Sequence, residues 1–179
     1  SMSALSRIPP PELGPAEDCY REALDLFRRL GETGDEGTVL NNLGYAYYSL
    51  GEPQPAEEHY RQALEIRREN GDRAGEAQIL NNLAVLFRGL GEIGTALTHY
   101  GEAREILASL DERRQEAAAL NNLGVAYNSL GEAERARIYF LAALDLRRAV
   151  EDRRGEVVTL NNLGWLERSR GEPEAAIPF

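Results

Sequence analysis

The sequence predicts an all-α protein built as a stack of antiparallel helix hairpins. The motif Leu-Asn-Asn-Leu recurs every 40 residues, beginning at Leu40, Leu80, Leu120 and Leu160. Within each period, apolar residues follow the i, i+3, i+4, i+7 spacing of an amphipathic helix. The composition agrees, because a chain that is 42% hydrophobic but only 7% aromatic is too apolar for disorder and too poor in aromatic residues for an all-β fold.

Each period predicts two helices. The stripe of the first helix is clearest in the second period, at Leu80, Leu83, Ala84, Phe87 and Leu90, and that of the second helix at Ala96, Tyr100, Ala103, Ile106 and Leu107. Gly91 between them supplies a left-handed C-cap, and Asp72 and Asp152 stand where first helices need N-caps. The pattern predicts helices over about 15–30, 36–50, 53–69, 73–90, 93–109, 112–130, 133–149 and 152–170.

The same period divides the chain into segments. We expect a partly disordered leading segment 1–14, a half repeat 15–30 with the second helix only, repeats 31–70, 71–110 and 111–150, and an incomplete repeat 151–179. In the last repeat, Glu167 and Arg170 replace apolar residues of earlier copies, which indicates a polar terminal cap. Ala176 nevertheless restarts a second helix.

These columns resemble the tetratricopeptide repeat, whose pattern is met in the first full copy by Leu40, Leu43, Gly44, Tyr47, Ala56, Tyr60 and Ala63. The period of 40 exceeds the usual one of about 34 and is similar to the long repeats of kinesin light chains, Pins/LGN adaptors and bacterial signalling arrays. HEAT and armadillo repeats share the period but do not predict these columns. The resemblance implies a right-handed superhelix whose first helices line a concave groove, and a non-catalytic scaffold for protein–protein interaction.

The paired asparagines need a reason, because Asn is a mediocre helix former. At about 100° per residue, the second Asn of each pair points away from the core. The resemblance places this column along the groove: Asn42, Asn82, Asn122 and Asn162. A primary amide can hold the N–H and C=O of an extended peptide regardless of its sequence, so we expect this column to bind peptide.

The first Asn of each pair lies on the flank of its helix, and this column is interpreted as structural or secondary, hydrogen-bonding neighbouring helices: Asn41, Asn81, Asn121 and Asn161. Other groove positions vary between repeats and are candidates for selectivity: Tyr45, Tyr48, Arg88, Asn128, Trp165 and Arg168. The arginines could pair with acidic ligand residues and the aromatics could seat an apolar anchor. The alternative is solvated arginines and ordinary packing aromatics. An Hsp90-type carboxylate clamp is poorly matched, because Asn stands where that clamp needs Lys.

Several function classes are excluded. A net charge of −10 and a pI near 4.8 argue against nucleic acid and anionic membranes as partners. Cys19, His59 and His99 share a column, but residues one repeat apart are too distant to bind one metal ion, so they are interpreted as outer-face residues. Acidic side chains are expected in solvated helical pairs such as Glu57–Arg61 and Asp145–Arg148, and neither a cofactor nor an enzyme is predicted.

The sequence predicts a cytoplasmic protein on three grounds. It has a single cysteine, residues 1–7 lack the apolar core of a signal peptide, and no apolar run is long enough to cross a bilayer. The second hypothesis is a regulatory or self-associating segment of a larger signalling protein, in which the groove is filled in cis or the open ends of the array stack on each other.

Overall fold

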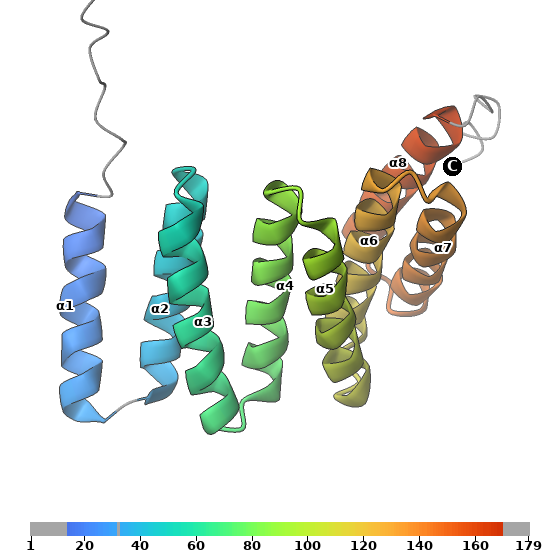
Figure 1. Cartoon of the computed structure of the whole chain (residues 1–179). Coiled ribbons are helices and arrows are strands. Elements are labelled where there is room, and N and C mark those ends of the chain that lie inside the picture. Colours follow the sequence, from blue (N-terminus) through green and yellow to red (C-terminus); the bar gives the residue numbers. More distant parts are fainter. Residues whose placement is uncertain (1–13, 32, 170–179) are drawn as a thin grey trace, which may run out of the picture. The chain divides into compact units, whose positions relative to one another are not determined.

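The computed structural model describes residues 14–31 and 33–169, and this part of the chain consists of eight α-helices joined by short turns (Figure 1). They are α1 (Pro15–Leu30), α2 (Thr33–Ser49), α3 (Pro53–Glu69), α4 (Arg73–Gly89), α5 (Ile93–Ser109), α6 (Arg113–Ser129), α7 (Ala133–Ala149) and α8 (Arg153–Ser169). Four helices have the predicted bounds, α4 ends one residue earlier than predicted, and α6 and α8 differ by one residue at each end.

The largest difference is at α2, which begins at Thr33 and not at residue 36. Gly34 and Gly37 are weak helix formers, yet α2 starts in the same repeat register as α4, α6 and α8. Packing within the repeat therefore outweighs local helix propensity here.

The turns between helices require a residue in the left-handed conformation. Gly91, the predicted C-cap, has φ of 80°, and most other turns also use glycine. Asp111 and Glu151 occupy the equivalent turn positions with φ of 56° and 55°, a conformation that costs a residue with a Cβ about 1–2 kcal/mol. These two turns therefore carry backbone strain that the glycine turns avoid.

The chain divides into two compact units, residues 1–66 and 67–179, with the boundary inside α3. In the first unit, Gly44 of α2 lies against Tyr60 of α3, and a Cβ on Gly44 would be 2.6 Å from Cδ1 of that ring. Burial raises the pKa of Tyr60 to about 12. Small residues in the first helix therefore let the aromatic residue of the second helix approach its backbone.

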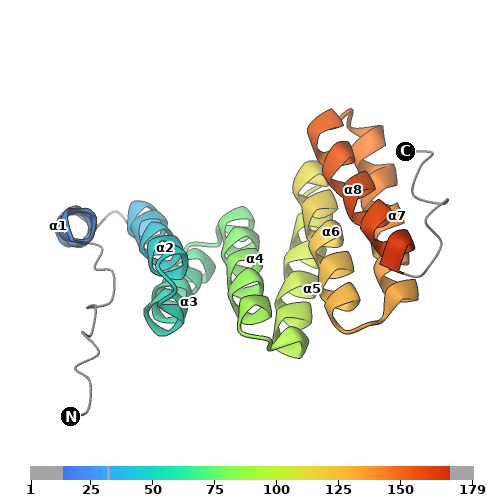
Figure 2. The ribbon, with the colours of Figure 1, turned by 90° about the horizontal axis from the view of Figure 1, so that it is seen from above.

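The second unit repeats this packing. Consecutive helices from α4 to α8 lie side by side, and α6 also contacts α8 (Figure 2). Gly124 faces Phe140 as Gly44 faces Tyr60, and a Cβ there would also lie 2.6 Å from the ring. The core is made of the predicted stripes, with Leu80, Leu83, Ala84, Ala96, Tyr100 and Ala103 at most 1% exposed. Leu90, predicted as the last residue of the first stripe, lies past the end of α4 and is 46% exposed. The asparagine-bearing helices α4, α6 and α8 are thereby fixed one repeat apart.

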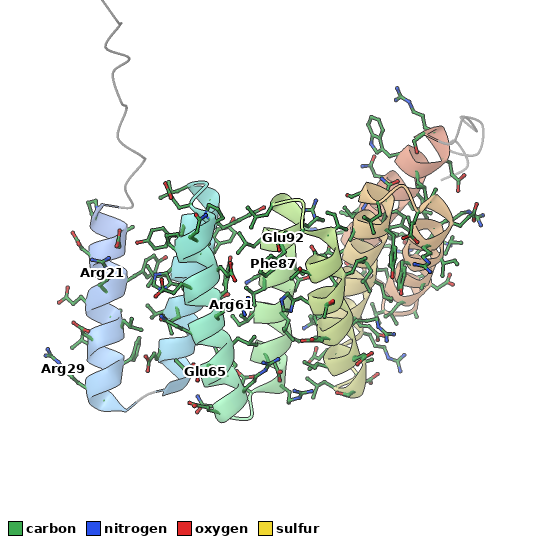
Figure 3. The ribbon with its side chains drawn as sticks, viewed as in Figure 1. Arg21, Arg29, Arg61, Glu65, Phe87 and Glu92 are labelled. Atoms are coloured by element: carbon green, nitrogen blue, oxygen red, sulfur yellow. The ribbon has the colours of Figure 1, made fainter. Side chains whose placement is uncertain are left out.

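Two charged features differ from expectation. Glu167 is 7% exposed and accepts a hydrogen bond from Nε of Arg137 at 3.0 Å. It is therefore a buried, paired carboxylate, whereas the predicted polar cap requires one that faces solvent. The Glu57–Arg61 pair forms at 2.8 Å (Arg61 in Figure 3), but Arg148 bonds Glu156 at 2.8 Å in place of the expected Asp145. Packing of α7 against α8 brings Glu156 within reach of Arg148.

The predicted disordered segment 1–14 falls almost entirely outside the described residues, as do Arg170 and the restart at Ala176. The division of the chain into repeats stays a prediction from the sequence.

Candidate functional site

Asparagine side chains of successive first helices bond to one another in the second unit. Nδ2 of Asn122 donates to Oδ1 of Asn81 at 2.9 Å, and Nδ2 of Asn162 donates to Oδ1 of Asn121 at 3.0 Å. The second Asn of one hairpin thus bonds the first Asn of the preceding hairpin, from α6 to α4 and from α8 to α6. Because a primary amide has two N–H groups and a carbonyl oxygen, Asn122 and Asn162 each keep one N–H and Oδ1 for other partners.

One link of this ladder is deeply buried. Asn121 is 5% exposed, and its Oδ1 also accepts from the hydroxyl of Thr159 at 3.3 Å. That hydroxyl in turn accepts from Nη1 of Arg147 at 2.7 Å, and the same guanidinium donates to the carbonyl of Gly155. Burial lowers the pKa of Arg147, and nearby Asp152 opposes that shift. This network fastens α6, α7 and α8 together.

The two asparagine columns differ along the chain. In the groove column, Asn42 of the first unit is exposed, whereas Asn82, Asn122 and Asn162 are half-buried. In the flank column, Asn41 and Asn81 are half-buried and Asn121 is buried, but Asn161 is exposed.

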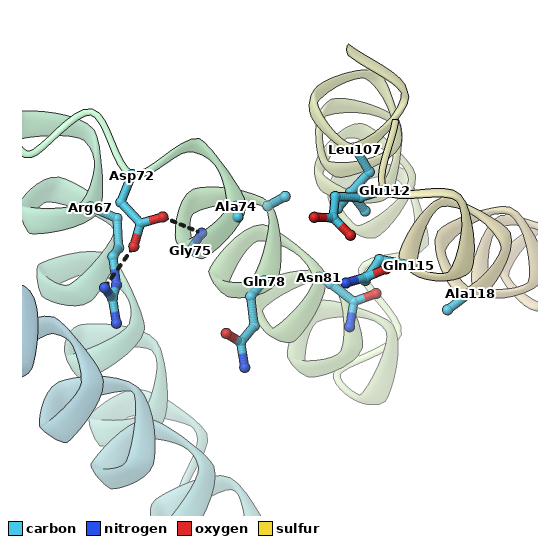
Figure 4. Close-up of a pocket in the computed structure, with 11 residues that line it drawn as sticks. Arg67, Asp72, Ala74, Gly75, Gln78, Asn81, Leu107, Glu112, Gln115 and Ala118 are labelled. Atoms are coloured by element: carbon cyan, nitrogen blue, oxygen red, sulfur yellow. Dashed lines mark hydrogen bonds and ion pairs between the residues drawn. The ribbon is translucent and has the colours of Figure 1, made fainter. Parts of the chain in front are cut away.

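A cleft of about 570 Å³ lies beside the ladder in the second unit. We call it the amide cleft, and it is lined by Arg67, Asp72, Ala74, Gly75, Ala77, Gln78, Asn81, Leu107, Glu112, Gln115 and Ala118. Three carboxamides line it: Gln78 and Asn81 come from α4 and Gln115 from α6 (Figure 4). Its volume is within the range of small-ligand sites, about 300–1,000 Å³.

The two carboxylates of the cleft differ in their hydrogen-bond partners. Asp72 accepts from Nη1 of Arg67 at 2.7 Å and caps α4 by accepting from the backbone N–H of Gly75 at 2.9 Å, as predicted for an N-cap (dashed lines in Figure 4). Glu112 stands at the equivalent position before α6 but makes no side-chain capping bond. Figure 4 shows it on the side of Asn81 and Gln115, opposite Arg67 and Asp72.

The predicted selectivity residues lie at different depths. Tyr45 and Trp165 are 62% and 60% exposed, and the guanidinium of Arg168 stacks over the Trp165 ring at 5.0 Å. Asn128 is exposed, whereas Tyr48 and Arg88 are half-buried. Trp165 and Arg168 therefore form an accessible aromatic and cationic pair on α8.

The column interpreted as outer-face is partly buried by ring stacking. His59 stacks on Tyr47 at 5.4 Å and His99 on Phe87 at 5.6 Å (Phe87 in Figure 3). Burial lowers the pKa of His59. Cys19 is exposed.

Among residues 14–31 and 33–169, no group of three or more His, Cys, Asp or Glu side chains is placed to hold a metal ion. No helix in the described part of the chain is both long and apolar enough to cross a membrane.

Comparison with known proteins decides the family. A family model described as tetratricopeptide repeat matches residues 16–69, 56–109 and 115–179. The chain belongs to the tetratricopeptide repeat family. The all-α fold predicted from the sequence is confirmed, and these repeats make the chain a protein-interaction scaffold of a family that is generally non-catalytic.

Several solved structures are similar to this chain. The crystal structure of BtubC (BKLC) from P. vanneervenii has a TM-score of 0.81 and 31% identity, covering 90% of this chain and 69% of that one. A Rap protein complexed with Competence and Sporulation Factor has a TM-score of 0.74 and 21% identity over 90% of this chain, which spans 47% of the Rap chain. A putative kinesin light chain of Podosopora anserina has a TM-score of 0.64 and 16% identity, covering 90% of this chain and 83% of that one. A search of curated protein sequences found no match.

Sequence reasoning missed the glutamines and Glu112 of the amide cleft. Helical spacing could have found the glutamines, since Gln78 lies four residues before Asn82 and Gln115 seven before Asn122, on the same helix faces.

Proposed function

We propose that the second unit is a non-catalytic scaffold that holds an extended peptide segment of a protein partner along α4, α6 and α8. The observation that carries the proposal is the amide cleft, which opens between two of these helices beside the asparagine ladder. Asn82, Asn122 and Asn162 bind the peptide backbone in this proposal.

The ladder supports backbone binding through preorganisation. The inter-helix bonds of Asn122 and Asn162 fix the orientation of both amides while each keeps one N–H and one carbonyl oxygen. A ligand then loses less free energy to ordering these side chains, since an immobilised side chain costs about 0.5–1.5 kcal/mol. The N–H and the carbonyl oxygen that each amide keeps can donate to and accept from one peptide unit of the ligand, whatever side chain that unit carries.

Side-chain selectivity is proposed to come from the variable positions. Trp165 and Arg168 offer an apolar surface beside a cation on α8, and Arg88 and Asn128 offer polar contacts on α4 and α6. In the first unit, Asn42, Tyr45 and Tyr48 are the equivalent candidates. The cytoplasmic location and the exclusion of nucleic acid, membranes and cofactors stay predictions from the sequence.

A peptide-display selection against the whole chain tests the proposal. The selected peptides are titrated against the wild type, the double variant Asn82→Ala/Asn122→Ala, and Asn161→Ala as a control from the exposed end of the flank column. We expect the double variant to weaken binding more than about tenfold, or ~1.4 kcal/mol, and the control to leave it unchanged.

Thermal unfolding of each variant shows whether it is folded at the assay temperature, because Asn122 also bonds Asn81. Equal affinity of a folded double variant and the wild type would contradict the proposal. A selection that enriches no peptide would contradict it as well.

One observation favours self-association as a second candidate. Val157 of α8 is 67% exposed, whereas Ala77 and Ala117 at the same repeat position are 0% exposed. A second copy that packs on α8 as the next repeat does on α4 and α6 would cover this face. Sedimentation equilibrium should then show a mass that rises with concentration and a monomer for Val157→Asp; a concentration-independent monomer would exclude this candidate.

A further inference from the structure

The turn before α6 lacks the contacts that occupy its counterparts before α4 and α8. Asp72 is held by Arg67 and by the N–H of Gly75, and Asp152 accepts from the N–H of Gly155 at 3.0 Å. The third carboxylate of this column is Glu112. In its repeat, Leu107 replaces the arginine and Gln115 replaces the glycine. Leu107 lacks the guanidinium that holds Asp72, and Gln115 carries a Cβ that, at the equivalent Gly75, would lie 2.5 Å from Oδ2 of the capping carboxylate.

The neighbouring arginines do not compensate Glu112. Nε of Arg113 donates to Asp111 at 2.7 Å, and Nη2 of Arg114 reaches the carbonyl of Val150 at 3.5 Å. Within residues 14–31 and 33–169, the structure shows no side-chain hydrogen bond or ion pair of the Glu112 carboxylate. A half-buried carboxylate thus lines the amide cleft without an ion-pair partner, since the one arginine of the lining, Arg67, is paired with Asp72.

The surroundings of Glu112 suit a ligand cation. Partial burial penalises a charged group that has no partner, so a cation entering the cleft gains a charge-assisted hydrogen bond where water is partly excluded. The carbonyl oxygens of Gln78 and Gln115 can accept its remaining N–H groups. The net charge of −10 also raises the rate at which cationic segments encounter the chain.

We propose that the amide cleft receives a lysine or arginine side chain of the bound peptide and that Glu112 forms its ion pair. This inference rests on the proposed function, because the ladder holds the backbone from which that side chain extends. Glu112 then sets which residue the ligand carries at this position, while the asparagines are indifferent to sequence.

The peptides from the display selection are the probes. We expect one position to be enriched in Lys or Arg. Replacing that residue with norleucine or citrulline should weaken binding to the wild type about tenfold. Glu112→Gln should weaken the selected peptide to a similar degree but leave the affinity of the neutral peptide unchanged. Glu116→Gln is the matched control, since it makes the same change one turn further along the chain, on α6 and outside the cleft lining. It should bind as the wild type does.

The outcomes separate the two proposals. If peptides bind and depend on Asn82 and Asn122, but show no basic position or bind Glu112→Gln and Glu116→Gln equally, the basic-residue inference is wrong and the peptide groove stands. If peptides bind independently of the asparagines, the groove fails. If none is enriched, both proposals fail.

Discussion

Removing the side chain of Asn121 should destabilise the second unit more than any other change in the asparagine ladder. Its Oδ1 accepts from Asn162 at 3.0 Å and from Thr159 at 3.3 Å, and Thr159 is 0% exposed. In Asn121→Ala, two hydrogen bonds of about 1 kcal/mol each are lost, and a buried hydroxyl loses its acceptor at a cost of about 1–3 kcal/mol. The hydroxyl still accepts from Arg147, so we expect a total near 3 kcal/mol.

The control is Asn161→Ala, the same substitution in the same column one repeat later. Asn161 is exposed, so its loss should cost less than about 0.5 kcal/mol. The assay is urea and thermal unfolding followed by the fluorescence of Trp165, the only tryptophan of the chain. For a chain of this size, 3 kcal/mol corresponds to a decrease in Tm of roughly 6–12 °C. If Asn121→Ala lowers Tm no more than Asn161→Ala, the buried network does not stabilise the stack and the reasoning is refuted.

Two further predictions concern stability. Burial lowers the pKa of His59, so the unfolded chain binds more protons at this residue than the folded chain does. The stability that His59 contributes is therefore present above its unfolded pKa near 6.5 and is lost as the pH falls through the lower folded pKa. His59→Tyr keeps a ring, as Tyr139 does in the next hairpin but one, and should flatten the decline in urea midpoint between pH 7.5 and 5; an unchanged slope would contradict the burial argument. Glu151→Gly should raise the free energy of unfolding by about 0.5–1 kcal/mol, because glycine relieves the strain of the positive φ. Asp111→Gly should gain less, because it also loses the ion pair with Arg113. A loss of stability in Glu151→Gly would argue against strain at this turn.

The sequence predicts the helices well because every 40-residue period specifies the apolar stripe, the small packing residue and the turn together. Agreement among four copies determined the register of α4, α6 and α8 within a residue. The exception, the start of α2, arose where Gly34 and Gly37 weaken the local helix signal while the repeat packing persists.

The site could be predicted only in part. Helical angles separate the two asparagine columns, but they do not show that Asn122 bonds Asn81 across two helices, since that depends on the spacing between repeats. Likewise, Asn121 and Asn161 stand in the same motif, Leu-Asn-Asn-Leu-Gly, yet Asn121 is buried where α8 packs against α6 and Asn161 is exposed. For Glu112, the replacement of the arginine by Leu107 is visible in the sequence, but the directions in which Arg113 and Arg114 turn are not.

The most direct test of peptide binding follows the side-chain amide resonances of Asn82, Asn122 and Asn162 by NMR during titration with a selected peptide. We expect these NH2 signals to shift as the peptide saturates the protein, together with the side-chain amides of Gln78 and Gln115. Resonances of Tyr127 and Tyr139, which stack at 5.2 Å outside the amide cleft, should stay unchanged. Shifts at the tyrosines with unmoved asparagine amides would place the ligand elsewhere and contradict peptide binding by the asparagine column.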